Sequence, residues 1–292
     1  MPGQPGAREP EALQAPAPLQ AYDASTVLAA FTPAFQFNDA LPDVCLITAD
    51  NLPFYTHRQV LQFASTNTFG GLLANHDESI NVSESYTVLP IVLHIIYGLS
   101  CLHLSPSLDT VDLAVDALVK YGVPVSKFAA PNSPLYQLII SHAPYRPIDT
   151  YALAAHHGLE PLAVDVSAHL LSYDTSNLTD ELSLKMGPVY IKRLFSLHLT
   201  RRAALKDIVM KPPALHHPNL ACGTGEQRQL TQAWALAAAE MAWDVRPSTS
   251  TYMLQSVFEK AGRDITCGEC RVMLEQRIQE AIDEWSAVRR TI

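Results

Sequence analysis

The sequence predicts an α+β fold, in which a small β-sheet flanked by helices precedes an all-helical C-terminal region. Three observations predict it. The apolar run Val44–Ile47 and the segment Leu52–Thr56 have strand length, and the turn signal Ala49-Asp50-Asn51 joins them into a hairpin. From His57 onward the apolar residues recur at helical spacing instead. From Asp149 to the end of the chain the pattern is helical throughout.

The predicted sheet domain continues with further short elements. Pro53 in the returning strand indicates a sheet edge, because proline cannot donate a ladder hydrogen bond. Val60 is predicted on the core face of the first helix, and Ser65 at the N-cap of a second short helix. The remaining elements of this domain are a third strand at Ser79–Val82 and helices at Val88–Tyr97, Leu108–Tyr121 and Leu135–Ala143.

Only helices are predicted in the second half of the chain. The last of them has a strong periodicity, because its apolar residues recur at every third or fourth position. These residues are Leu274, Ile278, Ile282 and Trp285. The predicted helices are Tyr151–Leu159, Leu162–Tyr173, Thr179–Lys185, Val189–Val209, Gln227–Trp243, Thr251–Ala261 and Cys270–Val288.

Composition and pattern divide the chain into four segments. Residues 1–36 form a tail rich in Pro and Ala, which we expect to be disordered because it contains too little apolar surface to bury. Residues 37–146 form the sheet domain. Residues 147–211 carry a helical pair, and residues 212–292 form a C-terminal helical region with a loop rich in Cys and His.

The sheet domain resembles the BTB/POZ domain. The residues that carry the resemblance are Pro42-Asp43-Val44, a turn with Asp50, an aromatic residue two positions before a histidine (Tyr55 and His57), Val60-Leu61, the step from Ser65 to Phe69, and Lys120-Tyr121. More narrowly, the whole chain resembles the BTB-domain proteins that are numerous in fungi, especially basidiomycetes. The helical pair after Asp149 is similar to the one that follows the domain in those proteins.

The resemblance implies a protein–protein interaction module. BTB domains associate with themselves or with other proteins, so the expected partners are a second copy of the chain or a different protein. One alternative is a substrate adaptor for a cullin-type ubiquitin ligase, since animal BTB domains followed by a helical pair bind the cullin. No repeat array for substrate binding is recognisable in this sequence.

Asp43 and His57 are the candidate interaction residues. They match polar positions of the BTB pattern that the family places near each other, where the first strand meets the first core helix, and we expect both to be exposed. Two interpretations remain open: a local hydrogen bond that fixes this corner, or direct contact with a partner.

Three of the five cysteines are candidate metal ligands. Cys267-Gly-Glu-Cys270 has CxxC spacing at the start of a helix, and Cys222 follows a His-His pair in a loop. Three thiolates and one histidine fill a tetrahedral Zn²⁺ shell. The predicted site is therefore Cys222, Cys267, Cys270 and His217, which hold one structural Zn²⁺.

The resemblance bears on the same cysteines. Related fungal BTB proteins often carry two CxxC pairs, which implies a Cys₄ site, but this sequence has Gly225 where the fourth cysteine would stand, so His216 or His217 is the substitute. Two alternatives remain open: a redox pair formed by Cys267 and Cys270, and plain packing thiols. Cys45 and Cys101 are expected to be small core residues.

Charge and composition exclude several classes of protein. The net charge is −9 and charged residues make up 17%, without a long basic run, so nucleic-acid binding is not expected. No secretory signal and no membrane-length apolar run is recognisable, and five cysteines are not a disulfide framework. We therefore expect an intracellular protein, in the nucleus or the cytoplasm.

Catalytic motifs are missing from the sequence. It contains no Gly-rich phosphate loop, no GxSxG elbow and no HExxH pair. His156 and His157 are adjacent on a predicted helix, where neighbouring side chains point in different directions and make a poor ligand pair. The chain is therefore not expected to be an enzyme.

Overall fold

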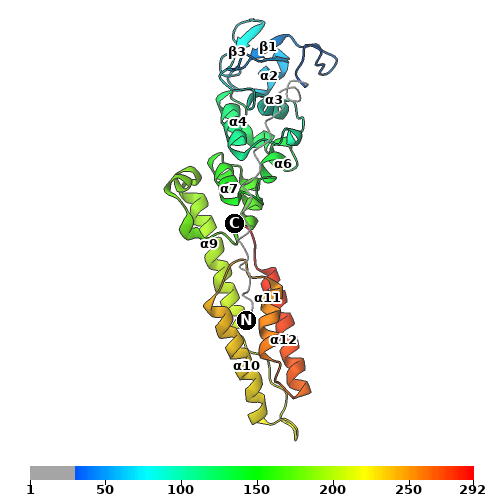
Figure 1. Ribbon diagram of the computed structural model, residues 1–292, viewed down its shortest axis with the longest axis vertical. Coiled ribbons are helices and arrows are strands. Elements are labelled where there is room, and N and C mark those ends of the chain that lie inside the picture. The colour runs from blue at the N-terminus through cyan, green and yellow to red at the C-terminus, as the bar shows by residue number, and fades with distance from the viewer. Residues whose placement is uncertain (1–29) are drawn as a thin grey trace, which may run out of the picture.

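The computed structural model of the chain describes residues 30–292 (Figure 1). The molecule is elongated, with the sheet at one end and a bundle of long helices at the other. The predicted tail lies outside the described residues as far as residue 29. From Ala30 the chain packs on the sheet domain: Phe31 is buried, and its carbonyl accepts a hydrogen bond from the backbone N–H of Tyr55 (2.9 Å).

The sheet has three strands, β1 (Val44–Ile47), β2 (Pro53–Thr56) and β3 (Ser79–Asn81), in the order β2-β1-β3. β1 pairs antiparallel with β2 and parallel with β3, so Leu46 lies opposite both Phe54 and Ile80. These three side chains are buried, because alternate residues of each strand point into the core. The predicted hairpin and third strand are confirmed.

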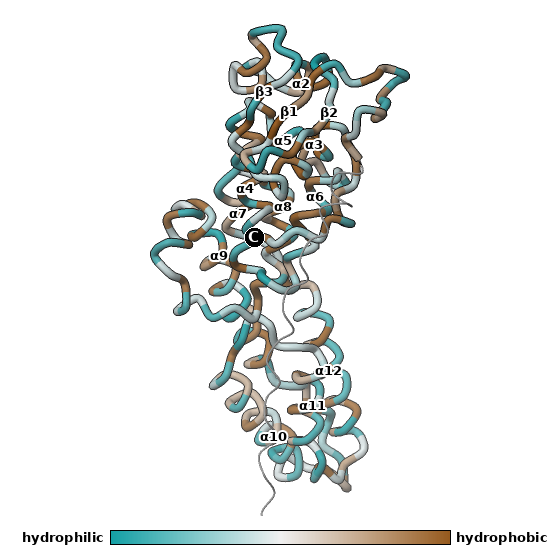
Figure 2. The backbone as a smooth tube through the Cα atoms, turned by 45° about the horizontal axis from the view of Figure 1, so that its top comes forward, coloured by the Kyte–Doolittle hydropathy of each residue, from teal (hydrophilic) through white to brown (hydrophobic). Residues whose placement is uncertain are grey.

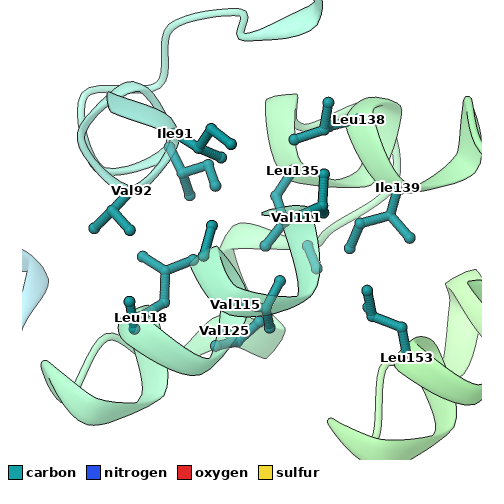
Figure 3. Close-up of a cluster of buried hydrophobic side chains, with 14 of the residues drawn as sticks. Ile91, Val92, Val111, Val115, Leu118, Val125, Leu135, Leu138, Ile139 and Leu153 are labelled. Atoms are coloured by element: carbon teal, nitrogen blue, oxygen red, sulfur yellow. The ribbon is translucent and has the colours of Figure 1, made fainter. Parts of the chain in front are cut away.

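Five helices complete the sheet domain: α2 (Arg58–Ala64), α3 (Leu89–Ile96), α4 (Leu108–Lys120), α5 (Val125–Phe128) and α6 (Pro134–Ile140). Every residue of α3 is buried, as expected for a helix that is apolar on all sides. Figure 3 shows Ile91 and Val92 of α3 facing Val111, Val115 and Leu118 of α4, with Leu135 and Ile139 of α6 on the same core. The predicted α+β fold is confirmed.

The predicted helix after Ser65 does not form. Ser65 instead ends α2, where its hydroxyl donates to the carbonyl of Tyr121 (2.6 Å) and accepts from the backbone N–H of Phe69 (2.7 Å). Gly70 and Gly71 both have left-handed φ angles, +66° and +80°, and this is incompatible with a right-handed helix. The segment therefore turns tightly, and this turn brings the Phe69 ring onto Tyr121 in a stack with 4.0 Å between centroids.

The middle of the chain is helical. It contains α7 (Pro147–His156), α8 (Glu160–Ser167) and the long α9 (Asp180–Val209). α9 is bent at Gly187, whose φ of 73° and ψ of 164° are non-helical, and Pro188 follows directly. The two helices predicted at Thr179–Lys185 and Val189–Val209 are therefore the two arms of one kinked element.

The lower arm of α9 forms a bundle with α10 (Thr224–Trp243), α11 (Thr251–Ala261) and α12 (Gly268–Ala287) (Figure 1). Its apolar core is separate from that of the upper part of the molecule and is built around Trp234 and Phe258, whose ring centroids lie 4.0 Å apart. In Figure 2 the bundle helices alternate between polar and apolar segments, as amphipathic helices do.

Two buried arginines link segments of the bundle through hydrogen bonds to backbone carbonyls. Arg201 on α9 donates to the carbonyls of Pro247, Val288 and Arg289 and lies over the Trp285 ring. Arg277 on α12 donates to the carbonyls of Ile208 and Lys211, at the end of α9. Both guanidinium groups satisfy backbone carbonyls that would otherwise be buried without partners. In the described part of the chain, no helix is long and apolar enough to cross a membrane.

Candidate metal centre and interaction surface

Four potential metal ligands meet at the end of the bundle that lies farthest from the sheet. The loop between α9 and α10 supplies His216 and Cys222, and the start of α12 supplies Cys267 and Cys270. Their ligand atoms all lie within 4.8 Å of one another. The Sγ atoms of Cys222 and Cys270 are 3.7 Å apart, and the Sγ of Cys267 is 3.5 Å from Nε2 of His216.

These distances fit a tetrahedral ion. With metal–sulfur bonds of about 2.3 Å and metal–nitrogen bonds of about 2.05 Å, a tetrahedron has edges of about 3.8 Å between two sulfurs and about 3.6 Å between sulfur and nitrogen. The two measured separations agree with these edges within about 0.1 Å. One nitrogen and three sulfurs form a donor set that suits a soft or borderline ion. The cluster could therefore bind a metal ion.

The first pair of ligands is fixed by a short turn. The side-chain oxygen of Asn219 accepts from the backbone N–H groups of Ala221 (3.0 Å) and Cys222 (2.8 Å). Backbone hydrogen bonds in both directions close the Asn219–Cys222 turn. Gly223 then caps α10, with its N–H bound to the Glu226 carboxylate (2.8 Å). The turn and the cap together hold the Cys222 thiol toward the bundle, where it is buried.

The second pair lies at the N-terminus of α12, where Cys267 is the N-cap residue. The backbone N–H of Cys270 is the main influence that lowers the pKa of the Cys267 thiol to about 7. Burial raises the pKa of Cys270 to about 12 and raises that of Cys222 as well. A cation at the centre favours all three thiolates, so binding of a metal ion would displace their protons.

His216 is oriented by its outer contacts. Its Nδ1 lies 2.8 Å from the His217 carbonyl, to which it donates, and 3.1 Å from the Glu269 carboxylate. Nε2 is thereby left as the acceptor nitrogen that faces Cys267. A carboxylate or carbonyl behind a metal-binding imidazole fixes the ring in this way in many metal sites. The predicted fourth ligand, His217, is exposed in the structure, and its neighbour His216 lies in the cluster instead.

Asp43 and His57 occupy the predicted corner between strand and helix, where Asp43 is exposed as expected and His57 is not. The carboxylate of Asp43 accepts from the backbone N–H of Arg58 (2.7 Å) and so caps α2. His57 is buried, contrary to expectation. Its Nε2–H donates to the Ala40 carbonyl (3.0 Å), and its Nδ1 accepts from the Tyr97 hydroxyl (3.0 Å). Both residues hold the corner together, and His57 is not available to a partner.

An apolar surface next to α2 was not predicted from the sequence. An open hollow of about 670 Å³ lies between α2, α5 and the segment before β1. Phe63, on the rim, is the most exposed phenylalanine of the described residues, with 94% of its surface accessible. The helical pattern contained a signal for this, because an aromatic residue occupies a position off the core face of Leu61 and Ala64. The hollow is lined by Phe37, Asn38, Gln59, Val60, Phe63, Ala64, Ile96, Pro124, Lys127 and Phe128.

Comparison of the chain with models of known protein families, with curated proteins and with solved structures finds no match.

Proposed function

We propose that this chain is a non-catalytic protein-interaction module of the BTB/POZ type, which associates with a second copy of itself through the α2 hollow. We further propose that a structural Zn²⁺, held by His216, Cys222, Cys267 and Cys270, closes its helical bundle. The observation that carries the first proposal is the exposed Phe63 side chain beside an open apolar hollow of about 670 Å³.

A two-fold symmetric dimer requires a patch that is complementary to itself. Phe63 projects from the rim of a hollow that is more than large enough for a phenylalanine ring. In a symmetric pair, the Phe63 ring of each copy enters the hollow of the other, so one pairing buries two rings and fills two hollows. Exposed aromatic anchors next to a complementary cavity are typical of the centres of protein interfaces.

The charges around the hollow support pairing between identical chains. The chain carries a net charge of −9, yet no acidic residue lines the hollow and Lys127 is its only charged residue. Contact between two copies through this patch therefore avoids the carboxylate repulsion that other faces of the molecule would bring. The polar side chains of Asn38 and Gln59 supply hydrogen-bonding groups to the contact.

The experiment is size-exclusion chromatography with light scattering over a range of protein concentrations. We expect the full chain to have twice the mass of one 32.0 kDa copy. Phe63→Asp should give a monomer with unchanged circular dichroism, because the side chain is exposed in the single copy. Tyr145→Asp, which alters another exposed aromatic residue outside the hollow, is the matched control and should remain a dimer. A monomeric full chain, or a dimeric Phe63→Asp variant, would overturn self-association.

The Zn²⁺ proposal has a separate test. Metal analysis of the same chromatographic peak should give one zinc ion per chain, and Cys270→Ser should lower this content sharply. Cys45→Ser is the control, because Cys45 lies on β1, far from the cluster. A metal content near zero in the chain purified with zinc present, or equal zinc in Cys270→Ser and the full chain, would refute the structural Zn²⁺.

A further inference from the structure

A second group of potential ligands lies in the upper part of the molecule, where α4 passes the end of α7. It consists of Asp116, His156 and His157, whose ligand atoms all lie within 4.8 Å of one another. The two histidines come together because α7 ends there. His157 is the C-cap residue, and Gly158 follows with a left-handed φ of +64°. The expectation that adjacent histidines diverge applies to a continuing helix, and the chain leaves the helix at this point.

His157 has an unsatisfied nitrogen. Its side chain is only 7% exposed, and its Nε2 has no hydrogen-bond partner among the described residues. The Asp116 carboxylate lies 3.5 Å from this nitrogen, which is too long for a hydrogen bond from a neutral ring. A buried polar atom without a partner is uncommon, because its desolvation is not compensated.

Within residues 30–292, one carboxylate of α4 lacks a cationic partner at the same place. Asp109, Asp112 and Asp116 are three and four positions apart and share one face of the helix. Arg146 pairs with Asp109 (2.9 Å), and Lys185 pairs with Asp112. Among the described residues, Asp116 pairs with no Lys or Arg, and its recorded neighbours are the two imidazoles. In the described part of the chain, two of the three carboxylates thus have a permanent cation beside them, and Asp116 does not.

We propose that Asp116, His156 and His157 form a second metal site, which takes a divalent transition-metal ion such as Zn²⁺ and links α4 to the end of α7. Bonds of about 2.05 Å to nitrogen and about 2.1 Å to oxygen give a tetrahedral edge of about 3.4 Å. The measured 3.5 Å between His157 Nε2 and the Asp116 oxygen agrees with it. His156 is exposed, so its ring is free to turn toward the ion.

The donor set defines the class of ion. Two imidazoles and one carboxylate suit Zn²⁺, Ni²⁺ and Cu²⁺, whereas Ca²⁺ and Mg²⁺ prefer oxygen ligands. Three protein ligands leave one position for water or another ligand, unlike the four-ligand cysteine cluster. The ion supplies the positive charge that Asp116 lacks and the partner that the His157 nitrogen lacks.

The test is a Co²⁺ titration of the full, metal-free chain, followed by absorption spectroscopy and calorimetry. Co²⁺ at the cysteine cluster gives an intense sulfur-to-cobalt charge-transfer band, whereas Co²⁺ at the histidine site does not. We expect two equivalents to bind, only one of which carries the band. Asp116→Asn and His156→Ala should each weaken the sulfur-free equivalent at least about tenfold and leave the band unchanged.

Both substitutions change exposed side chains and should not disturb folding. His76→Ala and Asp207→Asn, at exposed positions elsewhere, are the matched controls and should titrate like the full chain. A sulfur-free phase that is missing, or one that Asp116→Asn and His156→Ala leave intact, would overturn the proposal. The outcome is independent of the Zn²⁺ proposal above, because loss of the charge-transfer band alone would count against the cysteine cluster and not against this site.

Discussion

The Sγ atoms of Cys222 and Cys270 lie 3.7 Å apart, although the two residues are 48 positions apart in the sequence. One belongs to the loop that precedes α10 and the other to the first turn of α12. A metal ion at this point would join the loop before α10 to the start of α12. The cluster therefore links a local chemical feature to the stability of the whole bundle.

Removal of the metal should destabilise the bundle. A ligand present at roughly 100–1,000 times its Kd stabilises the folded state by about 3–4 kcal/mol, and a chelator removes this contribution. We expect thermal unfolding followed by circular dichroism to shift to lower temperature with chelator and to recover with added zinc. Cys45→Ser should respond to chelator like the full chain, whereas Cys270→Ser should be insensitive to it. Identical unfolding with and without chelator would contradict the prediction.

Arg201 should be essential for the junction between α9 and the end of the chain. Its guanidinium donates to three backbone carbonyls, those of Pro247, Val288 and Arg289. Lysine lacks the planar fork that serves these acceptors together, so Arg201→Lys should cost about 2–3 kcal/mol in unfolding free energy. Arg202→Lys changes the exposed neighbour and is the control. Equal urea midpoints for the two variants would show that the fork is unimportant.

Glu84 should make stability depend on pH. Burial acts to raise the pKa of this carboxyl, but hydrogen bonds from Lys120 and Tyr121 outweigh it and lower the pKa below the ordinary value of 4.5. A lowered pKa in the folded state gives stability that is present above the ordinary pKa and is lost as the pH falls through the folded value. Glu84→Gln should therefore flatten the acid limb of the stability profile between about pH 5 and 3. An acid limb that Glu84→Gln leaves unchanged would show that this carboxyl does not contribute to the pH dependence of stability.

Aspartate substitutions at Leu61 and Val60 should have different effects, although the two residues are neighbours on α2. Leu61 is fully buried, whereas Val60 is only half-buried and lines the hollow. Leu61→Asp places a charge in the core and should cost about 4 kcal/mol or more. Val60→Asp should cost about 1–2 kcal/mol in the single copy and act mainly on self-association. Chemical denaturation and light scattering on both variants check this; unfolding by Val60→Asp would reassign it to the core.

The cap on α2 gives a smaller prediction. Asp43 accepts the backbone N–H of Arg58 at the start of the helix (2.7 Å). Asp43→Ala should lower the unfolding free energy by about 1 kcal/mol. Asp43→Asn should retain most of the stabilisation by the cap, because an amide oxygen also accepts a hydrogen bond. Asp207→Ala, which removes an exposed carboxylate on α9, is the control and should have no measurable effect. A dimer-specific loss with Asp43→Ala would instead favour a contact with the partner.

Much of the secondary structure could be predicted because local patterns determine it. The helix Thr251–Ala261 is found as predicted. The bounds of α10 and α12 differ from prediction by a few residues only, because the amphipathic periodicity is strong there. The prediction for the segment after Ser65 was wrong, because a helix was expected and a tight turn forms. The helical spacing of Phe69, Leu72 and Leu73 outweighed Gly70-Gly71, and the competing contact of the Ser65 hydroxyl with Tyr121 is invisible in the local sequence.

The candidate sites divide in the same way. CxxC spacing pointed to Cys267 and Cys270 because a helix N-terminus and a short turn place two thiols on one side. The choice between His216 and His217 depends on a loop whose direction is set by Asn219, Gln227 and Glu269, and no spacing rule contains it. His57 was expected to be exposed because histidine is polar, and it is buried because Tyr97 and Ala40 satisfy both ring nitrogens.

The sequence by itself determined the α+β class, most helices and strands, and three of the four residues of the cysteine cluster, because these depend on periodicity, turn chemistry and ligand spacing within short segments. Only the tertiary structure decided which histidine joins the thiols, which aromatic residue stays outside beside a hollow, and that Asp116 meets two histidines at the end of α7. Those relationships join segments that are distant in the chain. Their geometry depends on how helices end and pack against one another, and no local pattern specifies it.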